Sequence, residues 1–281
     1  MVKSIAILGA GQMGSGIAQV CAQAGYAVSV IDISAEQRDR AKTIISKSLD
    51  KFVAKGVITA DVQGETLNRL SFEEKIPHSN FDLLIEAVTE NLTLKTQLLA
   101  NASQLLKPEA IIASNTSSIS LTQLAVATNR PDQVIGMHFM NPVPLMQLVE
   151  VIRSLTTSDT TFSVVAEVIA KIGKSMVVSQ DAPGFIVNRI LMPMINEAVY
   201  TLYEGIASPE DIDTAMKLGT NQPMGPLALA DLIGLDTCLA IMHVLHTGFG
   251  DSKYRPCPLL KNYVAAGWLG RKTGRGFYFY Q

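Results

Sequence analysis

Histidine is the side chain best suited to transferring a proton near neutral pH, because its imidazole titrates in that range. His138 stands where a predicted strand ends, and Glu150 lies 12 residues further on, inside the apolar run 148–152. A glutamate in such a run is costly to bury without a partner. A short turn between the two strands would let the carboxylate reach the imidazole, fix its tautomer and stabilise the imidazolium. The pair therefore predicts acid–base chemistry.

Simpler roles are open to both residues. A histidine at this position is about as often a hydrogen-bonded structural residue, and Glu150 could instead form an ion pair with Arg153 or Lys174. The spacing does not decide between these interpretations.

The other three histidines carry weaker signals. His78 lies in a polar stretch, where we expect it to be solvated. His243 and His246 are three residues apart on a predicted helix, but no acidic or cysteine ligand accompanies them at a suitable spacing. We therefore expect no metal site.

A glycine-rich motif near the start of the chain indicates a second function. The apolar run 2–8 is followed by G-x-G-x-x-G, a helical pattern to residue 25 and a second apolar run that ends on Asp32. The first glycine permits a tight turn, the second lets the backbone approach a pyrophosphate, and the third lets the helix pack on the strand. The helix N-terminus offers N–H groups and a positive dipole end to the phosphates. The motif predicts a dinucleotide site with these contacts: Gly9, Ala10, Gly11, Gln12, Met13 and Gly14.

The acid at the end of the second strand predicts which dinucleotide is bound. Asp32 can accept a hydrogen bond from a ribose 2′-OH, whereas its charge would repel the 2′-phosphate of NADP. No arginine directly follows it. We expect NAD as the cofactor, with NADP less favoured.

Strand-like and helical patterns alternate up to about residue 180. Residues 57–80 are polar, with only a short helix expected near 61–70. The alternation is typical of an α/β Rossmann-type fold, a doubly wound and mostly parallel sheet. Further strands are predicted at 81–88, 110–113, 134–137, 148–152 and 175–178.

Ligands of such sheets bind beyond the carboxyl ends of the strands. Asp32, Glu90, Ser117 and His138 all fall at or just past predicted strand ends. We therefore expect these four polar side chains along one edge of the sheet.

The pattern changes after residue 182. Residues 183–281 predict an all-α C-terminal domain, with a long helix that contains Pro193 and another from about 227 to 245. The expected domains are thus 1–182 for the dinucleotide and 183–281 for the helical part.

A possible docking surface lies on the helix that follows Asp32. Ser48, Lys51 and Lys55 have spacings that place them on one side of that helix. An ordinary solvated face is the more frequent explanation, and a site for a phosphorylated ligand is the alternative.

Composition excludes several other classes of protein. The net charge of −2 and the lack of a basic run argue against nucleic-acid binding. A strand that begins at residue 2 leaves no room for a signal peptide, and no apolar stretch of about 18 residues lacks charges or amides, so we expect no membrane span. The three cysteines form no C-x-x-C motif and suggest a reducing compartment, so we expect a cytoplasmic protein.

The chain resembles the 3-hydroxyacyl-CoA dehydrogenase family, and most of all the short bacterial 3-hydroxybutyryl-CoA dehydrogenases. The similarity spans nearly the whole chain. It rests on five segments: GAGQMGSGIAQ, ASNTSS, GMHFMNPVPLMQLVEV, DAPGFIVNRILMPMINEA and GWLGRKTGRGFY. The family often has Phe where Met140 stands and Lys where Gln147 stands.

The resemblance implies a role for each matching residue. His138 would be the catalytic base and Glu150 its orienting carboxylate, while Ser117 and Asn188 would hydrogen-bond the substrate oxygen at C3. Ser48 and Lys55 would contact coenzyme A, and the helical domain would form a homodimer. Further positions at or beside the NAD site would be Glu90, Lys95, Asn115, Ser117, Asn141 and Lys272.

The expected activity is therefore reversible hydride transfer between NAD and C3 of an (S)-3-hydroxyacyl-CoA, with 3-hydroxybutyryl-CoA as the expected substrate. One alternative is a related dehydrogenase of a free hydroxy acid or sugar acid, which would not need the basic face with Lys51 and Lys55. Another is a non-catalytic dinucleotide-binding protein, which would not need Ser117, His138, Glu150 and Asn188 together.

Overall fold

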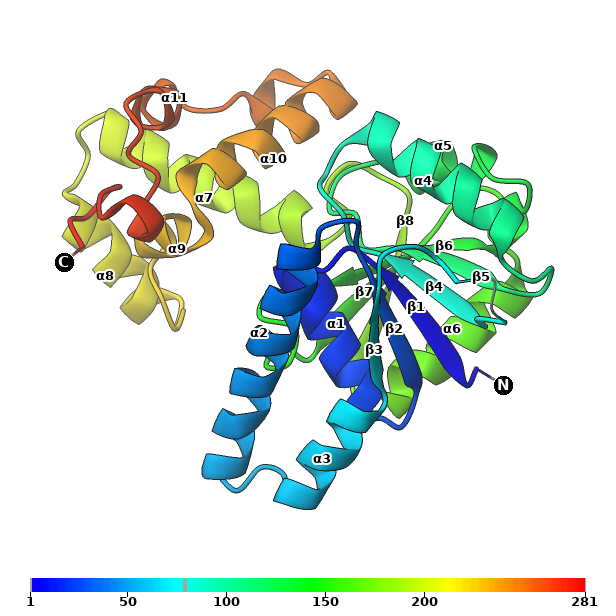
Figure 1. The fold of residues 1–281 in the computed structure, drawn as a ribbon. Coiled ribbons are helices and arrows are strands. Elements are labelled where there is room, and N and C mark those ends of the chain that lie inside the picture. Colours follow the sequence, from blue (N-terminus) through cyan, green and yellow to red (C-terminus); the bar gives the residue numbers. More distant parts are fainter. Residues whose placement is uncertain (1, 78–79, 281) are drawn as a thin grey trace. The chain divides into compact units, whose positions relative to one another are not determined.

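The computed structural model describes residues 2–77 and 80–280, so His78 lies outside the described residues. The chain divides into two compact units, Met1–Ala182 and Pro183–Gln281, and each is described by itself. The first unit is α/β and the second is helical (Figure 1).

The first unit is built on one sheet of eight strands in the order β3-β2-β1-β4-β5-β6-β7-β8. Neighbouring strands are parallel except for β6 and β7, which are antiparallel. The order reverses at β1 and β4, and ligands of such sheets bind beyond the carboxyl ends of these strands. The Rossmann-type fold is confirmed. Its elements are β1 (Ser4–Leu8), α1 (Gln12–Gln23), β2 (Ala27–Ile31), α2 (Ala35–Ala54), α3 (Ala60–Asn68), β3 (Leu70–Glu73), β4 (Leu83–Glu86), α4 (Leu92–Leu105), β5 (Ile111–Ser114), α5 (Leu121–Val126), a 3₁₀ turn (Pro131–Gln133), β6 (Val134–Phe139), β7 (Leu148–Arg153), α6 (Asp159–Lys171) and β8 (Ser175–Gln180).

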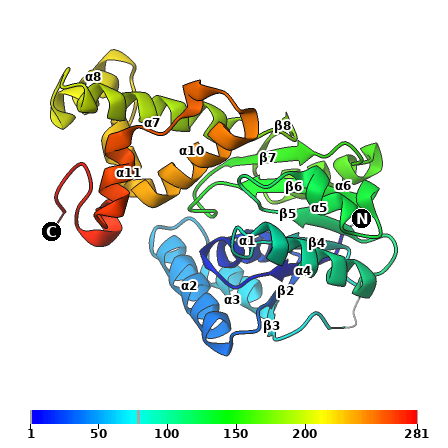
Figure 2. The same ribbon diagram turned by 90° about the horizontal axis from the view of Figure 1, so that it is seen from above.

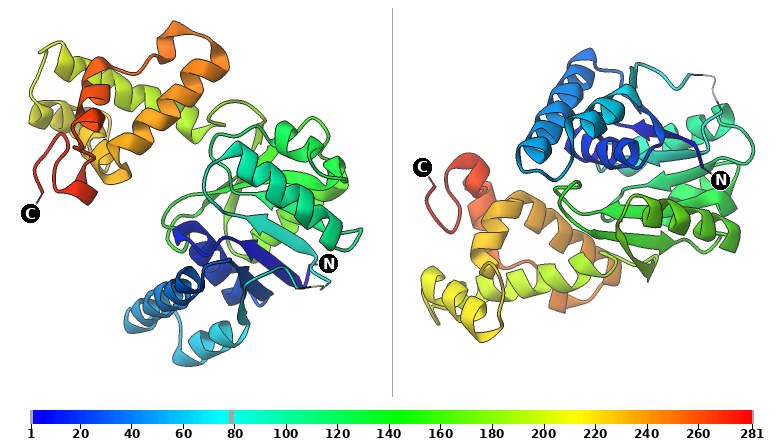
Figure 3. Two further views of the ribbon diagram at one scale, coloured as in Figure 1. Left: turned by 45° about the horizontal axis from the view of Figure 1, so that its top comes forward. Right: turned by 90° about the horizontal axis from the view of Figure 1, so that it is seen from below.

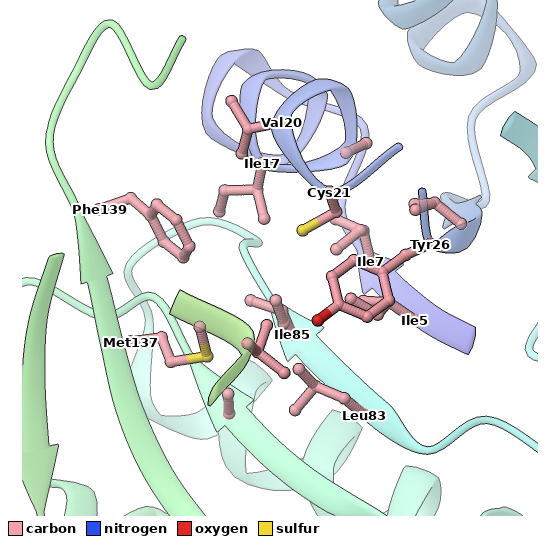
Figure 4. Close-up of a cluster of buried hydrophobic side chains, with 14 of the residues drawn as sticks. Ile5, Ile7, Ile17, Val20, Cys21, Tyr26, Leu83, Ile85, Met137 and Phe139 are labelled. Atoms are coloured by element: carbon pink, nitrogen blue, oxygen red, sulfur yellow. The ribbon is translucent and has the colours of Figure 1, made fainter. Parts of the chain in front are cut away.

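Helices cover both faces of the sheet, which is why the central strands are apolar on both sides. Helices α1, α2 and α6 share a core with one face, and α4 and α5 lie on the other (Figures 1 and 2). On the first face, α1 packs Ile17 and Cys21 against Ile7 of β1 and Ile85 of β4 (Figure 4).

The structure adds a strand where the sequence predicted only a short helix. Helix α3 is present, but it is followed by β3, which pairs with β2 at the edge of the sheet. The hydroxyls of Ser71 in β3 and Ser29 in β2 lie 2.7 Å apart. All four residues of β3 are half-buried, and a strand so short gives no clear alternation of polar and apolar residues.

The second unit is a cluster of helices around α7 (Val187–Tyr203), with α10 (Leu235–Phe249) and α11 (Pro258–Ala265) packed beside it (Figures 1 and 3). Its core contains Met192, Val199, Leu235 and Leu245. The other elements are α8 (Pro209–Gly219), α9 (Pro226–Ile233) and two 3₁₀ turns (Ser252–Tyr254, Arg271–Thr273).

The single helix predicted from 227 to 245 is wrong. Gly234 has φ +104°, which lies outside the helical region, and it separates α9 from α10. Within the described residues no single helix is long and apolar enough to cross a membrane, although α9 and α10, bent by 98°, pass by length and composition as a pair.

Candidate active site

The glycine-rich loop joins β1 to the N-terminus of α1 and packs closely against the end of the sheet. The Gly9 N–H donates to Ile31 O (2.8 Å), and Gly9 has φ +103°. A Cβ at Gly14 would lie 1.9 Å from Gly9 O, so only glycine fits there. At Gly11, by contrast, no described atom lies within 4 Å of the position a Cβ would take. The second glycine thus leaves open space in front of a helix N-terminus.

Asp32 follows β2 and is tied to this loop. Its Oδ2 accepts from the Ala10 N–H and its Oδ1 from the Ser34 N–H, both at 2.9 Å. The Arg38 guanidinium, the first basic group along the next helix, donates to the backbone carbonyl of Asp32. The carboxylate therefore stands beside the glycine loop at the end of β2.

Strands β6 and β7 bring the predicted acid–base pair together. His138 is directly opposite Glu150 in the antiparallel register, and His138 Nδ1 lies 2.6 Å from Glu150 Oε2. The glutamate side chain is 0% exposed and the imidazole 8%. Because a carboxylate can only accept, Nδ1 is assigned as the hydrogen-bond donor in this contact.

The alternative partners of Glu150 are engaged elsewhere. Arg153 pairs with Asp159 (2.7 Å), and Lys174 Nζ donates to the carbonyls of Val143 (2.7 Å) and Met146 (2.6 Å).

The loop after β5, the strand that pairs with β6, is held in place by Glu90. One oxygen of Glu90, Oε1, accepts from Thr116 Oγ1 (2.6 Å) and from the N–H groups of Ser117 (2.9 Å) and Ser118 (3.0 Å). The hydroxyls of Ser117 and Ser118 also reach this oxygen, at 3.3 and 2.9 Å. Burial by itself would raise the pKa of Glu90, but the Lys95 ammonium and these hydrogen bonds lower it below its usual value.

Two asparagines connect the loops of this edge. Asn115 Oδ1 accepts from the N–H of Phe139, the residue after His138, at 2.8 Å. Asn141, which follows β6, accepts from Gln12 Nε2 of the glycine loop at 2.9 Å, and the Asn141–Pro142 peptide bond is cis. Hydrogen bonds therefore connect the loop after β5 to the end of β6, and the loop after β6 to the glycine loop after β1.

Lys95, which was expected at or beside the NAD site, is buried and not exposed to a ligand. It lies in α4, is 1% exposed, and forms an ion pair with Glu86 Oε1 at 2.6 Å. Glu86 ends β4 and was missed by sequence reasoning. The signal was present, because Glu86 is the one charge inside the apolar stretch 83–88 and is as costly to leave unpaired as Glu150.

The remaining predicted residues lie on helices or in the helical unit. Ser48 of α2 is half-buried, while Lys51 of α2 and Lys55, the residue directly after the helix, are exposed. Asn188 is a buried residue in the first turn of α7. Lys272 Nζ lies 2.6 Å from both carboxylate oxygens of Asp236, within the helical unit. No group of three or more metal-ligating side chains occurs in the part of the chain that the structure describes.

Comparison with known proteins gives matches to both units. The 3-hydroxyacyl-CoA dehydrogenase NAD binding domain matches residues 4–182, and the C-terminal domain of the same family matches residues 184–280. The chain is 55% identical over its whole length to a 3-hydroxybutyryl-CoA dehydrogenase of Bradyrhizobium diazoefficiens, 96% of which is covered. It is 53% identical to a probable 3-hydroxybutyryl-CoA dehydrogenase of Bacillus subtilis, with 100% of this chain and 98% of that one covered.

A solved structure agrees with these matches. The crystal structure of (S)-3-hydroxybutyryl-CoA dehydrogenase from Ralstonia eutropha has a TM-score of 0.96 and 50% identity, and all of both chains is covered. Two family domains in the expected order, together with relatives this similar over their full length, leave one conclusion. The chain belongs to the 3-hydroxyacyl-CoA dehydrogenase family.

Proposed function

We propose that this protein interconverts (S)-3-hydroxyacyl-CoA and 3-oxoacyl-CoA with NAD, and that 3-hydroxybutyryl-CoA and acetoacetyl-CoA are its substrate pair. The observation that carries the proposal is the buried contact between His138 and Glu150, at 2.6 Å, at the ligand-binding edge of an NAD-binding fold. The relatives named above support the choice of substrate.

The residues of the glycine loop fit NAD. The open space beside Gly11 and the N-terminus of α1 support a pyrophosphate site at this loop. Asp32, which follows β2 and contacts the same loop, is proposed to accept a hydrogen bond from a ribose hydroxyl, and its charge would favour NAD over NADP. When bound, NAD supplies the hydride acceptor at its nicotinamide ring.

His138 and Glu150 provide the proton transfer. With Nδ1 donating to Glu150, Nε2 of His138 accepts the proton of the C3 hydroxyl as the substrate is oxidised. The carboxylate stabilises the imidazolium that forms and holds the ring in one orientation. In the reverse direction the same imidazolium returns the proton to the oxygen.

Ser117 and Asn188 are proposed to hydrogen-bond the substrate oxygen at C3, where negative charge develops. Hydrogen-bond donors stabilise such charge, and the single hydroxyl proton of Ser117, which points to Glu90 Oε1 at 3.3 Å, would turn to the substrate oxygen when the substrate binds. Ser117 lies on the loop that Glu90 holds, and Asn188 is fixed by the first turn of α7. The proposed cofactor contacts beyond the glycine loop are Asp32, Glu90, Asn115, Ser117, Asn141 and Lys272, with Lys95 beside them.

Ser48 and Lys55 are proposed to bind the phosphates or ribose of coenzyme A. The exposed ammonium groups of Lys51 and Lys55 give this side of α2 a positive charge that suits a phosphorylated ligand. A free hydroxy acid has no phosphate or ribose that this surface could bind.

We also propose that the protein is a cytoplasmic homodimer that associates through the helical unit. The three cysteines are free and buried, which suits a reducing compartment. Large apolar side chains are exposed on the helical unit, among them Ile206 (68%), Leu218 (82%) and Phe279 (78%). Light scattering coupled to size-exclusion chromatography should give the mass of a dimer, and a monomer would contradict this part.

The function is tested by following NADH absorbance with acetoacetyl-CoA and, in parallel, with free acetoacetate. We expect rapid oxidation of NADH with the CoA ester and a far lower kcat/KM with the free acid. Equal kcat/KM for the two compounds would favour a hydroxy-acid dehydrogenase. No turnover with either would support a non-catalytic dinucleotide-binding protein.

A further inference from the structure

A fully buried carboxylate lies beneath the proposed site and takes no part in the mechanism above. Glu86 is the last residue of β4 and is 0% exposed. Its Oε2 accepts from Ser114 Oγ at 2.6 Å, and its Oε1 accepts from the Val88 N–H at 2.7 Å and from Lys95 Nζ at 2.6 Å. Its backbone carbonyl accepts from the Asn115 N–H at 2.8 Å. Glu86 thus joins β4, α4 and the end of β5.

Lys95 donates its hydrogen bonds to protein atoms. An ammonium has three N–H donors, and Lys95 Nζ has three acceptors close by: Glu86 Oε1 (2.6 Å), Glu90 Oε2 (3.3 Å) and Val88 O (3.3 Å). Because the lysine is also buried, it acts on Glu90 rather than directly on a ligand.

Glu90 therefore stands between two sets of donors. Its Oε2 faces the ammonium of Lys95, while its Oε1 holds the backbone and hydroxyls of the loop with Ser117. Two carboxylates share one ammonium. Glu86, at the shorter distance, interacts more strongly with the ammonium of Lys95 than Glu90 does. The negative charge of Glu90 is therefore less neutralised by Lys95 and remains available to the loop.

We propose that Glu86 is a positioning residue for Ser117. By holding Lys95 in place and anchoring Ser114, it keeps Glu90 in the geometry that fixes the Ser117 loop. This inference rests on the proposed function, in which Ser117 contacts the substrate oxygen. Glu86 itself touches neither substrate nor cofactor.

The first variant is Glu86→Gln, which keeps the size of the side chain and removes its charge. Lys95 is then left with Glu90 as its carboxylate partner, and it draws Glu90 away from the loop. We expect kcat with acetoacetyl-CoA and NADH to fall on the order of 10- to 100-fold, as for other residues that orient a reacting group. The KM for the CoA ester should change little, because the hydrogen-bond partners of Glu86 lie in α4, at the end of β5 and just after β4, and none lies on α2.

The decisive measurement is a double-mutant cycle with Ser117→Ala. If Glu86 acts through Ser117, Glu86→Gln should reduce kcat in the wild-type background and have little further effect once Ser117 is alanine. A purely structural residue would cause the same fractional loss in both backgrounds. That result, or an undiminished kcat for Glu86→Gln alone, would overturn the inference.

Two further variants serve as an alternative test and as a control. Ser114→Ala removes the hydroxyl that donates to Glu86 at 2.6 Å and accepts from the Thr116 N–H at 3.3 Å, without burying a new charge. It should fold even if Glu86→Gln does not, and it should show a smaller loss of kcat with the same dependence on Ser117. Equal losses with and without Ser117 would again contradict the inference.

Asp82→Asn is the matched control, because Asp82 pairs with Lys107 beside the other end of β4, and it should leave kcat unchanged. If the wild-type protein itself has no activity, it is the proposed function that fails.

Discussion

His138 and Glu150 face each other across the antiparallel strands β6 and β7, and their side chains meet at 2.6 Å in the interior of the protein. The reversal of chain direction between these strands is what makes the contact possible. In a parallel crossover, a strand that ends in a histidine would be followed by a helix, and a residue 12 positions later could not lie opposite it. The one antiparallel pair in the sheet therefore coincides with the proposed acid–base pair.

Two glycines of the same loop should respond differently to the same substitution. Gly14→Ala places a methyl group 1.9 Å from a backbone oxygen, so we expect it to lower the stability of the protein by about 1–3 kcal/mol or more. Gly11→Ala has room in the protein itself and should keep the wild-type melting temperature. It should nevertheless weaken NADH binding about 10- to 100-fold, because the methyl group occupies the space that the pyrophosphate needs. Thermal melts and NADH titrations distinguish the two, and normal NADH affinity in Gly11→Ala would remove the pyrophosphate from this position.

Asp32 should determine the choice between NAD and NADP. Its carboxylate would face the 2′-phosphate of NADP, and such a like-charge contact costs several kcal/mol. Asp32→Ala also loses the hydrogen bond to the Ala10 N–H, but this loss affects both cofactors and cancels in the ratio of their kcat/KM values. We expect that ratio to fall at least about tenfold towards NADP. A wild-type enzyme that prefers NADP would refute the assignment.

Lys55 should contribute to binding of the CoA ester and not to the chemical step. Lys55→Gln is expected to raise KM for acetoacetyl-CoA about two- to fivefold, the usual strength of an exposed charge contact, and to leave kcat unchanged. The effect should shrink as salt is added. Lys42→Gln is the control on the same helix, because Lys42 pairs with Asp39 and packs on Phe72 instead. Equal KM changes for both variants would mean that α2 contributes only general positive charge.

The pH dependence of stability should reveal the ion pair before β4. Burial alone would raise the pKa of Asp82, but Lys107 and the N–H groups of Lys3 and Ser4 lower it to about 2. A carboxyl whose pKa is lower in the folded protein stabilises it above the pKa of the unfolded chain, and this contribution is lost as the pH falls towards 2. Asp82→Asn should therefore cost about 2 kcal/mol near pH 7, about half of that near pH 3 and little near pH 2. Denaturant unfolding followed by circular dichroism at several pH values provides the test, and a cost independent of pH would contradict it.

The sequence was informative where a local pattern has one structural solution. The glycine spacing with a following acid leads to a dinucleotide loop, and an isolated glutamate in an apolar strand requires a partner nearby. It did not indicate the partners of Glu86. Glu86 pairs with Lys95 of α4 and Ser114 of β5, and no spacing links the three residues. The break at Gly234 was missed because the apolar pattern continues across it, although the backbone there turns by 98°.

In the proposed reaction His138 transfers the proton, and Glu150 orients the imidazole of His138. The most direct test is kcat for acetoacetyl-CoA reduction by NADH in His138→Gln, after circular dichroism and NADH titration have shown that the variant is folded and binds cofactor. We predict a fall on the order of 10²–10⁴-fold, the usual contribution of a general acid–base group. A kcat within a factor of a few of the wild-type value would contradict the account.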